Sequence, residues 1–476
     1  MPTKLQLFDT LSRSLHPIKV KDGDSFRFYC CGPTVYGPAH IGNFRTFLVQ
    51  DVFRRTLEVA GIKTHHVRNI TDVDDKTIRQ SQAEGVTLKD FTDKWTQKFH
   101  EDCAQLNMLP PHEEPSAVQH IPQQIELIEQ LIECGHAYTA EDGSVYYKVS
   151  SFKNYGKLAH LDPQALKTQS TSSSGATNLA DEYERESIND FALWKAKKPE
   201  DGPNAWPSPW GEGRPGWHIE CSAMARHYLG DTLDLHAGGI DLIFPHHENE
   251  IAQTEAVTQK PLAHHWLHSA HLQVEGQKMS KSLGNLYTLE DLKTQGHSPA
   301  AVRYLLISGH YRQPLNFTAD GLKAANSALQ KLEKLIKSLL EQANKYPSDW
   351  ASYVKPDIKA WGIFQSAWDS LCNDLNIPSA LGHIFSSSRE IGQTTEEKSH
   401  TLLQALGGLI YALGLPLFET PEKVAIPDSI QKLAAARWQA KQNKDFKASD
   451  EFRDELLKHG WQVLDQKEGY TLEKKP

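Results

Sequence analysis

The 476-residue sequence predicts an α/β protein built on a doubly wound, Rossmann-like parallel sheet and followed by a helical bundle. An aromatic, β-prone run breaks at Gly-Pro, an amphipathic helix follows it, and a second β-prone run comes next. Strand, helix and strand at this spacing form a parallel βαβ unit. From about residue 317 the apolar residues recur with the period of a helix, which predicts the bundle.

The first predicted strand lies in SFRFYCCGPTVY, residues 25–36, and the second in KTHHVRNITDVDD, residues 63–75. A helix is predicted between them over residues 40–61, since glycine ends an apolar stripe at Gly61. A second α/β stretch is predicted over 215–257. The stripe of the first helix consists of Phe44, Phe47, Leu48, Val52 and Phe53.

We expect residues 135–206 to be inserted into this domain. GHAYTAEDGSVYYKV predicts a hairpin, and the low-complexity residues 170–178 predict a flexible loop. In the bundle, Leu322, Leu329, Leu332, Ile336, Leu339 and Leu340 form one stripe. The expected segments are the first half of the nucleotide-binding domain (1–134), the insertion (135–206), the second half (207–265), a loop and contact region (266–316), the bundle (317–420), and a linker with a C-terminal unit (421–476).

Composition narrows the function classes. The net charge is −9, so any nucleic-acid binding must come from local basic patches. The six cysteines include no CxxC pair, which argues against a disulfide framework. No signal peptide and no run long enough to span a membrane is evident, so a cytoplasmic protein without a membrane partner is expected.

HIGN, residues 40–43, lies at the junction of the first predicted strand and the first predicted helix. The unpaired N–H groups and positive dipole end of a helix N-terminus suit a triphosphate. Gly42 leaves room for a nucleotide, and His40 and Asn43 offer hydrogen bonds to phosphate oxygens. The alternative is an ordinary N-cap turn with a buried histidine.

GQKMSKSLGN, residues 276–285, contains two lysines, two serines and flanking glycines. Such a loop can close on phosphate charge that develops in a reaction and open afterwards. The alternative is a solvated surface loop.

FPHHENE, residues 244–250, offers metal ligands. On a helix, His246 and Glu250 share a face, and His247 with Glu250 is the rival pair, whereas Glu248 points elsewhere. A tetrahedral zinc site would need softer ligands from other segments.

Two segments offer cysteine ligands. Cys221 shares a face with Trp217 on a helix predicted after Pro-Gly. At the first strand only one of Cys30 and Cys31 can point into a site, because adjacent strand residues face opposite ways. The alternative is two small buried cysteines and a polar helix start.

Five motifs in order, CGPTVYGPAHIGN, RNITDVDDK, GRPGWHIECSAM, FPHHENEIAQ and KMSKSLGN, resemble those of the cysteinyl-tRNA synthetases, a family of class I aminoacyl-tRNA synthetases. The similarity covers the whole chain, and Asn43 replaces the histidine of the family's best-known first signature. The resemblance implies an ATP-dependent, monomeric ligase that joins L-cysteine to the 3′-terminal adenosine of tRNA(Cys). An enzyme that joins cysteine to an amino-sugar is the alternative, and a tRNA-binding relative without activity is a weaker one.

The resemblance also implies residue roles. One Zn²⁺ would be held by Cys31, Cys221, His246 and Glu250, with His247 and Glu248 left out. Catalytic contacts to ATP, which Mg²⁺ accompanies, would come from His40, Asn43, Lys278 and Lys281, with Gly42, Gly238 and Gly239 beside the nucleotide. The cysteine pocket would include Thr71, Trp217, His236 and Asp241, although Ala237 and Ile240 stand where the family usually has glycine and serine.

Zinc suits the choice between cysteine and serine. A hydrophobic pocket separates side chains of similar size only weakly. Zinc favours a thiolate, and a serine hydroxyl is a harder and far less acidic ligand. Selection at the metal would make a separate editing site unnecessary.

The resemblance implies that the C-terminal segment 429–476 recognises the anticodon of the tRNA. It also implies that the bundle at 317–420 supports the inner side of the tRNA and that the insertion at 135–206 contacts its acceptor end. Arg437, Lys441 and Lys444 recur at helical spacing and predict a basic ridge. Trp438 is available for stacking on a base, and Trp461 is expected in a local core.

Overall fold

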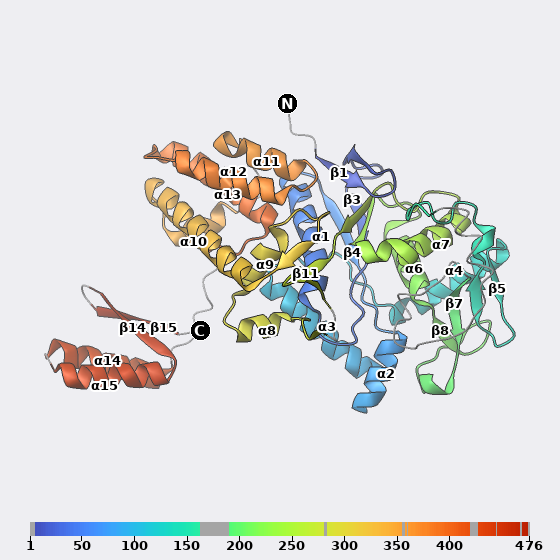
Figure 1. The fold of residues 1–476 in the computed structure, drawn as a ribbon, viewed down its shortest axis with the longest axis horizontal. Helices are drawn as coiled ribbons and strands as arrows, with labels where there is room; N and C mark the ends of the chain where they lie inside the picture. The colour runs from blue at the N-terminus through green and yellow to red at the C-terminus, as the bar shows by residue number, and fades with distance from the viewer. Residues whose placement is uncertain are drawn as a thin grey trace. The chain divides into compact units, whose positions relative to one another are not determined.

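A computed structural model describes residues 5–161, 190–279, 283–354, 358, 360–418, 427–443, 445–466 and 469–474. The chain forms two compact units, Met1–Leu417 and Phe418–Pro476, each of which is described by itself (Figure 1). Three predicted features lie outside the described residues: the loop at 170–178, Lys281 and Lys444.

The central sheet has four parallel strands in the order β10-β9-β3-β4. Helix α1, Ile41–Val59, connects β3 to β4, so the predicted βαβ unit and fold class are confirmed. The strands are β3 (Phe26–Cys30), β4 (Thr64–Arg68), β9 (Leu235–Gly239) and β10 (Trp266–Ser269).

The side chains of β3 alternate between two covering helices. Phe28 packs its ring 5.5 Å from that of Phe53 on α1. On the other face, Tyr29 and Cys31 share a core with Cys221 of helix α6, Trp217–Leu229. The alternation therefore turns Cys31, and not Cys30, toward α6.

The insertion contains an antiparallel sheet of β5 (Ala137–Thr139), β6 (Val145–Tyr147), β7 (Phe191–Ala196) and β8 (Gly213–Pro215). Its first two strands confirm the predicted hairpin. Glu248 accepts hydrogen bonds from the backbone N–H groups of Gly156, Leu158 and Ala159 at 2.7–3.0 Å. These hydrogen bonds connect the insertion to the helix that carries Glu248. They also explain why the Glu248 carboxylate points away from the candidate metal ligands.

The rest of the first unit is mostly helical, and the predicted stripe of the bundle is buried on α10. None of the described helices is long and apolar enough to cross a membrane. These helices are α2 (Asp75–Glu84), α3 (Leu88–Gln105), α4 (Ile121–Glu133), α7 (Glu248–Thr258), α8 (Leu289–Thr294), α9 (Pro299–Ile307), α10 (Ala319–Gln342), α11 (Gln365–Cys372), α12 (Ile377–Glu390) and α13 (Glu396–Leu413). The short strands are β1 (Gln6–Asp9), β2 (Ser14–Pro17), β11 (Leu272–Val274), β12 (Gln277–Lys278) and β13 (Leu315–Phe317).

A buried arginine joins the bundle to the sheet domain. Arg303 on α9 donates to Asp51 Oδ2 on α1 at 2.6 Å and to the carbonyls of Leu106, Asn107 and Leu413 at 2.8–3.0 Å. Arg55 also pairs with Asp51, at 2.9 Å. Burial alone would raise the pKa of Asp51, but the two arginines hold it below its usual value.

The C-terminal unit consists of α14 (Asp428–Gln442), α15 (Phe446–Lys458), β14 (Trp461–Gln466) and β15 (Gly469–Lys474). Trp461 lies in its small core, as predicted. Arg437 is only 6% exposed, so the predicted ridge is wrong at this position, because α14 turns this residue inward. Lys441 lies over the ring of Trp438 at 5.9 Å, and Trp438 contacts Tyr470.

His66 on β4 gives the fold a pH dependence. Its ring stacks on Phe28 at 4.5 Å, and burial followed by Arg68 and Arg54 holds its pKa well below 6.5. Below pH 6.5 the unfolded chain binds a proton at His66 that the folded chain does not. The free energy of unfolding therefore decreases as the pH decreases, by up to about 1.4 kcal/mol per pH unit. Replacing His66 with phenylalanine should reduce the fall in Tm between pH 7.5 and 5.5.

Thermal denaturation at the two pH values tests this expectation. His264→Phe is the control, because that side chain is exposed and should leave the pH dependence as in the wild type. An equal fall in Tm for His66→Phe and wild type would contradict the assignment.

Candidate active site and metal centre

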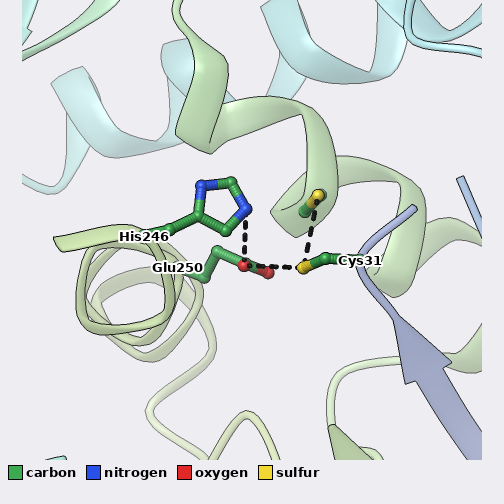
Figure 2. Close-up of side chains that lie close together, drawn as sticks. Cys31, His246 and Glu250 are labelled. Carbon is green, nitrogen blue, oxygen red and sulfur yellow. Dashed lines mark hydrogen bonds and ion pairs between the residues drawn. The ribbon is translucent and has the colours of Figure 1, made fainter. Parts of the chain in front are cut away.

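Four buried side chains from three segments converge as the sequence predicts. Cys31 follows β3, and Cys221 lies on α6. His246 lies in the helical turn Ile243–His247 that leads into α7, and Glu250 lies in the first turn of α7. The four ligand atoms all lie within 4.8 Å of one another, with Cys31 Sγ 3.9 Å from Cys221 Sγ and 3.6 Å from Glu250 Oε1. Figure 2 shows Cys31, His246 and Glu250 pointing toward one another.

The orientation of His246 leaves one ring nitrogen for a ligand. Its Nδ1 lies 2.8 Å from Nδ1 of His218, and its ring packs 4.1 Å from that of Trp217. Its Nε2 is buried and lies 3.1 Å from Glu250 Oε1, without a hydrogen bond to any described residue. A buried nitrogen held toward two thiols and a carboxylate is what a metal ligand requires.

A second group shares two of these residues and consists of Cys31, His236, His247 and Glu250. His247 Nε2 lies 3.3 Å from Cys31 Sγ, so the rival histidine is close to the cluster. In this group, however, Nε2 of His236 is occupied by a hydrogen bond with Glu250 Oε2 at 2.9 Å. Two thiolates suit zinc better than one, so the donor set favours the first group.

The pKa shifts of the cluster residues are also those expected at a site for a cation. Burial, then the hydrogen bond and charge of Cys221 and the charge of Glu250, raise the pKa of the Cys31 thiol well above its usual value. Burial, then His218 and His236, lower the pKa of His246. A divalent cation supplies the positive charge that stabilises thiolates and neutral imidazoles, so the residues present fit Zn²⁺.

A cleft of about 610 Å³ runs from this cluster to the start of α1. Cys31 and Trp217 line it at one end, and His40, Asn43 and Lys278 line it elsewhere. Among the described lining residues, Asp241 is the only carboxylate, and Lys76 and Lys278 are the only lysines. The cleft therefore places the metal cluster and the two predicted phosphate motifs around one continuous space.

HIGN begins α1 with a reciprocal cap. His40 Nδ1 accepts a hydrogen bond from the backbone N–H of Asn43 at 3.2 Å, and Asn43 Oδ1 accepts one from the N–H of His40 at 3.1 Å. The N-cap alternative from the sequence is thus present, and both side chains also line the cleft. A Cβ on Gly42 would lie 3.0 Å from His40 Nδ1 and 3.2 Å from Met279 Sδ, so this glycine lets the two motifs approach.

The described part of the KMSKS segment faces the same cleft. Lys278 and Met279 line it, and Lys278 O accepts a hydrogen bond from Asn285 Nδ2 at 3.2 Å. Gly276 and Gly284 on either side have φ of +76° and +62°, which favour glycine.

Two of the four predicted cysteine-pocket residues line the cleft, and the other two do not. Trp217 and Asp241 line the cleft. His236 lies behind Glu250, and Thr71 is buried and donates to Glu220 Oε2 at 3.2 Å, so neither is among the described lining residues. Gly239 lines the cleft, whereas a Cβ on Gly238 would lie 2.8 Å from His247 Cε1, so Gly238 makes room for that ring.

Sequence reasoning missed three supports of the cluster. Asn69 Oδ1 accepts from the N–H of Gly32 at 2.9 Å and lies 3.7 Å from Cys221 Sγ. His218 contacts His246, and His268 Nε2 lies 2.8 Å from His247 Nδ1. Asn69 and His218 stand in two of the motifs and His268 stands in none, but no local pattern distinguishes a supporting polar residue from a solvated one.

Comparisons with known proteins agree with this geometry. Residues 17–327 match the family model described as the class I tRNA synthetase (C) catalytic domain. The chain is 50% identical to a cysteine–tRNA ligase of Opitutus terrae, over 98% of this chain and 99% of that protein. It is 43% identical to the cysteine–tRNA ligase of Chlamydia muridarum, over 99% of both chains.

Solved structures show the same fold at low identity. Methionyl-tRNA synthetase of Mycobacterium tuberculosis, in complex with methionyl-adenylate, has a TM-score of 0.57 at 14% identity and covers 90% of this chain and 96% of its own. A leucyl-tRNA synthetase of Agrobacterium radiobacter in a ternary complex has a TM-score of 0.57 at 12% identity and covers 84% of each chain. With the family-model match and the relative at 50% identity, the chain belongs to the cysteine–tRNA ligase family of class I aminoacyl-tRNA synthetases.

Proposed function

We propose that the enzyme activates L-cysteine with ATP to cysteinyl-adenylate and pyrophosphate, and then transfers cysteine to the 3′-terminal adenosine of tRNA(Cys). The observation that carries this proposal is the single cleft lined by Cys31 and Trp217 of the metal cluster, by His40 and Asn43 at the start of α1, and by Lys278. A thiol-selective site and a triphosphate site that share one cleft suit the formation of an adenylate.

Cys31, Cys221, His246 and Glu250 would hold Zn²⁺, which when bound supplies selectivity for the substrate thiolate over the serine hydroxyl. His218 fixes the ring of His246, so that Nε2 faces the site. Trp217 covers the cluster on the side of the cleft, and the carboxylate of Asp241 suits the ammonium group of the amino acid. These contacts would aim the substrate carboxylate toward the start of α1.

In the first step the cysteine carboxylate attacks the α-phosphorus of ATP, and pyrophosphate leaves. Positioning and charge stabilisation carry such a step without a covalent protein intermediate. His40 and Asn43 would contact the triphosphate, which Mg²⁺ accompanies, and Lys278 and Lys281 would stabilise its developing charge. Gly239 lets the backbone approach the nucleotide.

The acceptor distinguishes this proposal from its alternative, a ligase for an amino-sugar. The second compact unit, Phe418–Pro476, supports a tRNA acceptor because the relatives that match the chain over nearly its full length, this unit included, are tRNA ligases. Within that unit, Lys441 and Trp438 offer a cation and a ring for an anticodon base.

The direct test is cysteine-dependent ATP–pyrophosphate exchange followed by charging of tRNA(Cys), with serine as the competing amino acid and a glucosamine derivative as the competing acceptor. We expect exchange with cysteine and not serine, and transfer only to tRNA. Exchange without tRNA charging, together with a product on the amino-sugar, would overturn the proposal in favour of the alternative.

Lys281→Ala should slow adenylate formation by about a hundredfold, because one cation is lost that acts on charge developing in the transition state. The affinity for cysteine should change little, since the amino-acid pocket surrounds the metal cluster. Pre-steady-state formation of the adenylate and equilibrium binding of cysteine measure the two effects. Unchanged exchange would remove the assignment.

A further inference from the structure

One wall of the cleft has no part in the proposed adenylation. It consists of Tyr36 from the loop before α1, Lys76 at the start of α2 and Trp95 on α3, which all line the cleft together with Phe99. We call these four residues the aromatic wall. They come from three segments and bring three aromatic rings and one lysine to the same cleft.

Three residues of the aromatic wall, Tyr36, Lys76 and Trp95, are half-buried, whereas Phe99 is buried. The ammonium of Lys76 lies over the ring of Tyr36 at 5.3 Å. Trp95 is half-buried, and its Nε1 is buried without a hydrogen-bond acceptor among the described residues. Phe99 is fixed from behind, since its ring stacks on that of Phe44 at 5.9 Å. The wall thus offers the rings of Tyr36 and Trp95 and the ammonium group of Lys76 to the cleft.

We propose that the aromatic wall binds the single-stranded 3′ end of the acceptor tRNA and guides its terminal adenosine to the adenylate. This inference rests on the proposed function. Aromatic rings with a nearby cation are typical of single-strand binding, in which bases stack on rings and a lysine contacts the backbone phosphate. Lys76 supplies the phosphate contact, and Tyr36 and Trp95 supply the stacking surfaces.

The wall suits a nucleotide strand better than the triphosphate of ATP. Phosphate groups of ATP are usually held by several backbone N–H groups at a helix end. The aromatic wall presents rings and the ammonium group of Lys76 instead. This ammonium group matches one phosphodiester beside stacked bases. The triphosphate has its own contacts at His40, Asn43 and Lys278 on the neighbouring part of the cleft.

The test separates the two half-reactions in Lys76→Met. Cysteine-dependent ATP–pyrophosphate exchange is measured without tRNA, and transfer is measured in a single turnover from preformed enzyme-bound adenylate. We expect transfer to fall about tenfold more than exchange, which corresponds to the loss of one stacked or phosphate contact. The affinity ratio between tRNA ending in CCA and tRNA ending in CC should also shrink.

Lys94→Met is the matched control, because Lys94 packs on the ring of Trp95 at 4.8 Å but is not among the described lining residues. It should leave transfer, exchange and the affinity ratio close to wild type. Trp95→Leu should reproduce the effect of Lys76→Met. If Trp95→Leu fails to fold, Lys76→Met still decides the question, because its half-buried side chain is not one of the buried core residues.

Equal losses of exchange and transfer in Lys76→Met would assign the wall to ATP and overturn the inference. Unchanged transfer with an unchanged affinity ratio would also overturn it. Failure of the proposed function is a different result, since wild-type enzyme would then not charge tRNA(Cys) at all.

Discussion

Cys221→Ser is expected to lose stoichiometric zinc and to lower cysteine-dependent ATP–pyrophosphate exchange by at least about a hundredfold. Cys221 contributes one of two soft ligands in a group whose ligand atoms lie within 4.8 Å of one another. Serine keeps nearly the same volume but replaces the thiolate with a hydroxyl that zinc binds poorly. Discrimination between cysteine and serine should decrease as zinc is lost.

The paired cysteines at the end of β3 give a close control. Cys31→Ser should lose zinc as Cys221→Ser does, whereas Cys30→Ala should keep it, because Cys30 faces the other side of the sheet. Metal analysis of the purified variants and exchange assays measure both effects. Full zinc occupancy in Cys221→Ser, or zinc loss in His247→Asn with retention in His246→Asn, would move the site to the second group of ligands.

Arg303→Met is expected to lower the free energy of unfolding of the first unit by about 3–5 kcal/mol, since it removes one of the two arginines that pair with the buried Asp51. Asp51 would lose the 2.6 Å bond to Arg303 Nη2 and keep only Arg55 and one backbone donor. The carbonyls of Leu106 and Leu413 would also lose a donor. Because α9 follows the KMSKS segment, we expect activity to fall with stability.

Denaturant unfolding of the full chain measures this loss. Lys323→Met is the control, because its pair with Asp320 is solvent-exposed and should contribute less than about 1 kcal/mol. Asp51→Asn combined with Arg303→Met should cost less than the sum of the single changes. An effect of Arg303→Met no greater than that of Lys323→Met would show that the buried network does not hold the bundle.

The fold was predictable where one local period decides the structure. The apolar stripe of α1 and the alternation on β3 each follow from a repeat within a single segment, and both were confirmed. The burial of Arg437 was not predictable, because α14 places a basic residue on its inward side and spacing alone does not give the phase of a helix against its neighbours.

The candidate site divides in the same way. The pairing of His246 with Glu250 follows from helix geometry, and the motifs led to Cys31 and Cys221. The roles of His218 and Asn69 depend on segments that meet only in three dimensions. The same holds for the aromatic wall, in which Lys76 and Trp95 belong to different helices and share no sequence pattern.

The reciprocal cap of His40 and Asn43 has a consequence for turnover. If ATP binds here as proposed, its phosphate must replace the cap's hydrogen bonds to the N–H groups of His40 and Asn43 instead of filling vacant ones. The net affinity at this helix end would then be small, and the cap would re-form when pyrophosphate departs. Such an exchange would keep the product from being retained and return the enzyme to a relaxed resting state.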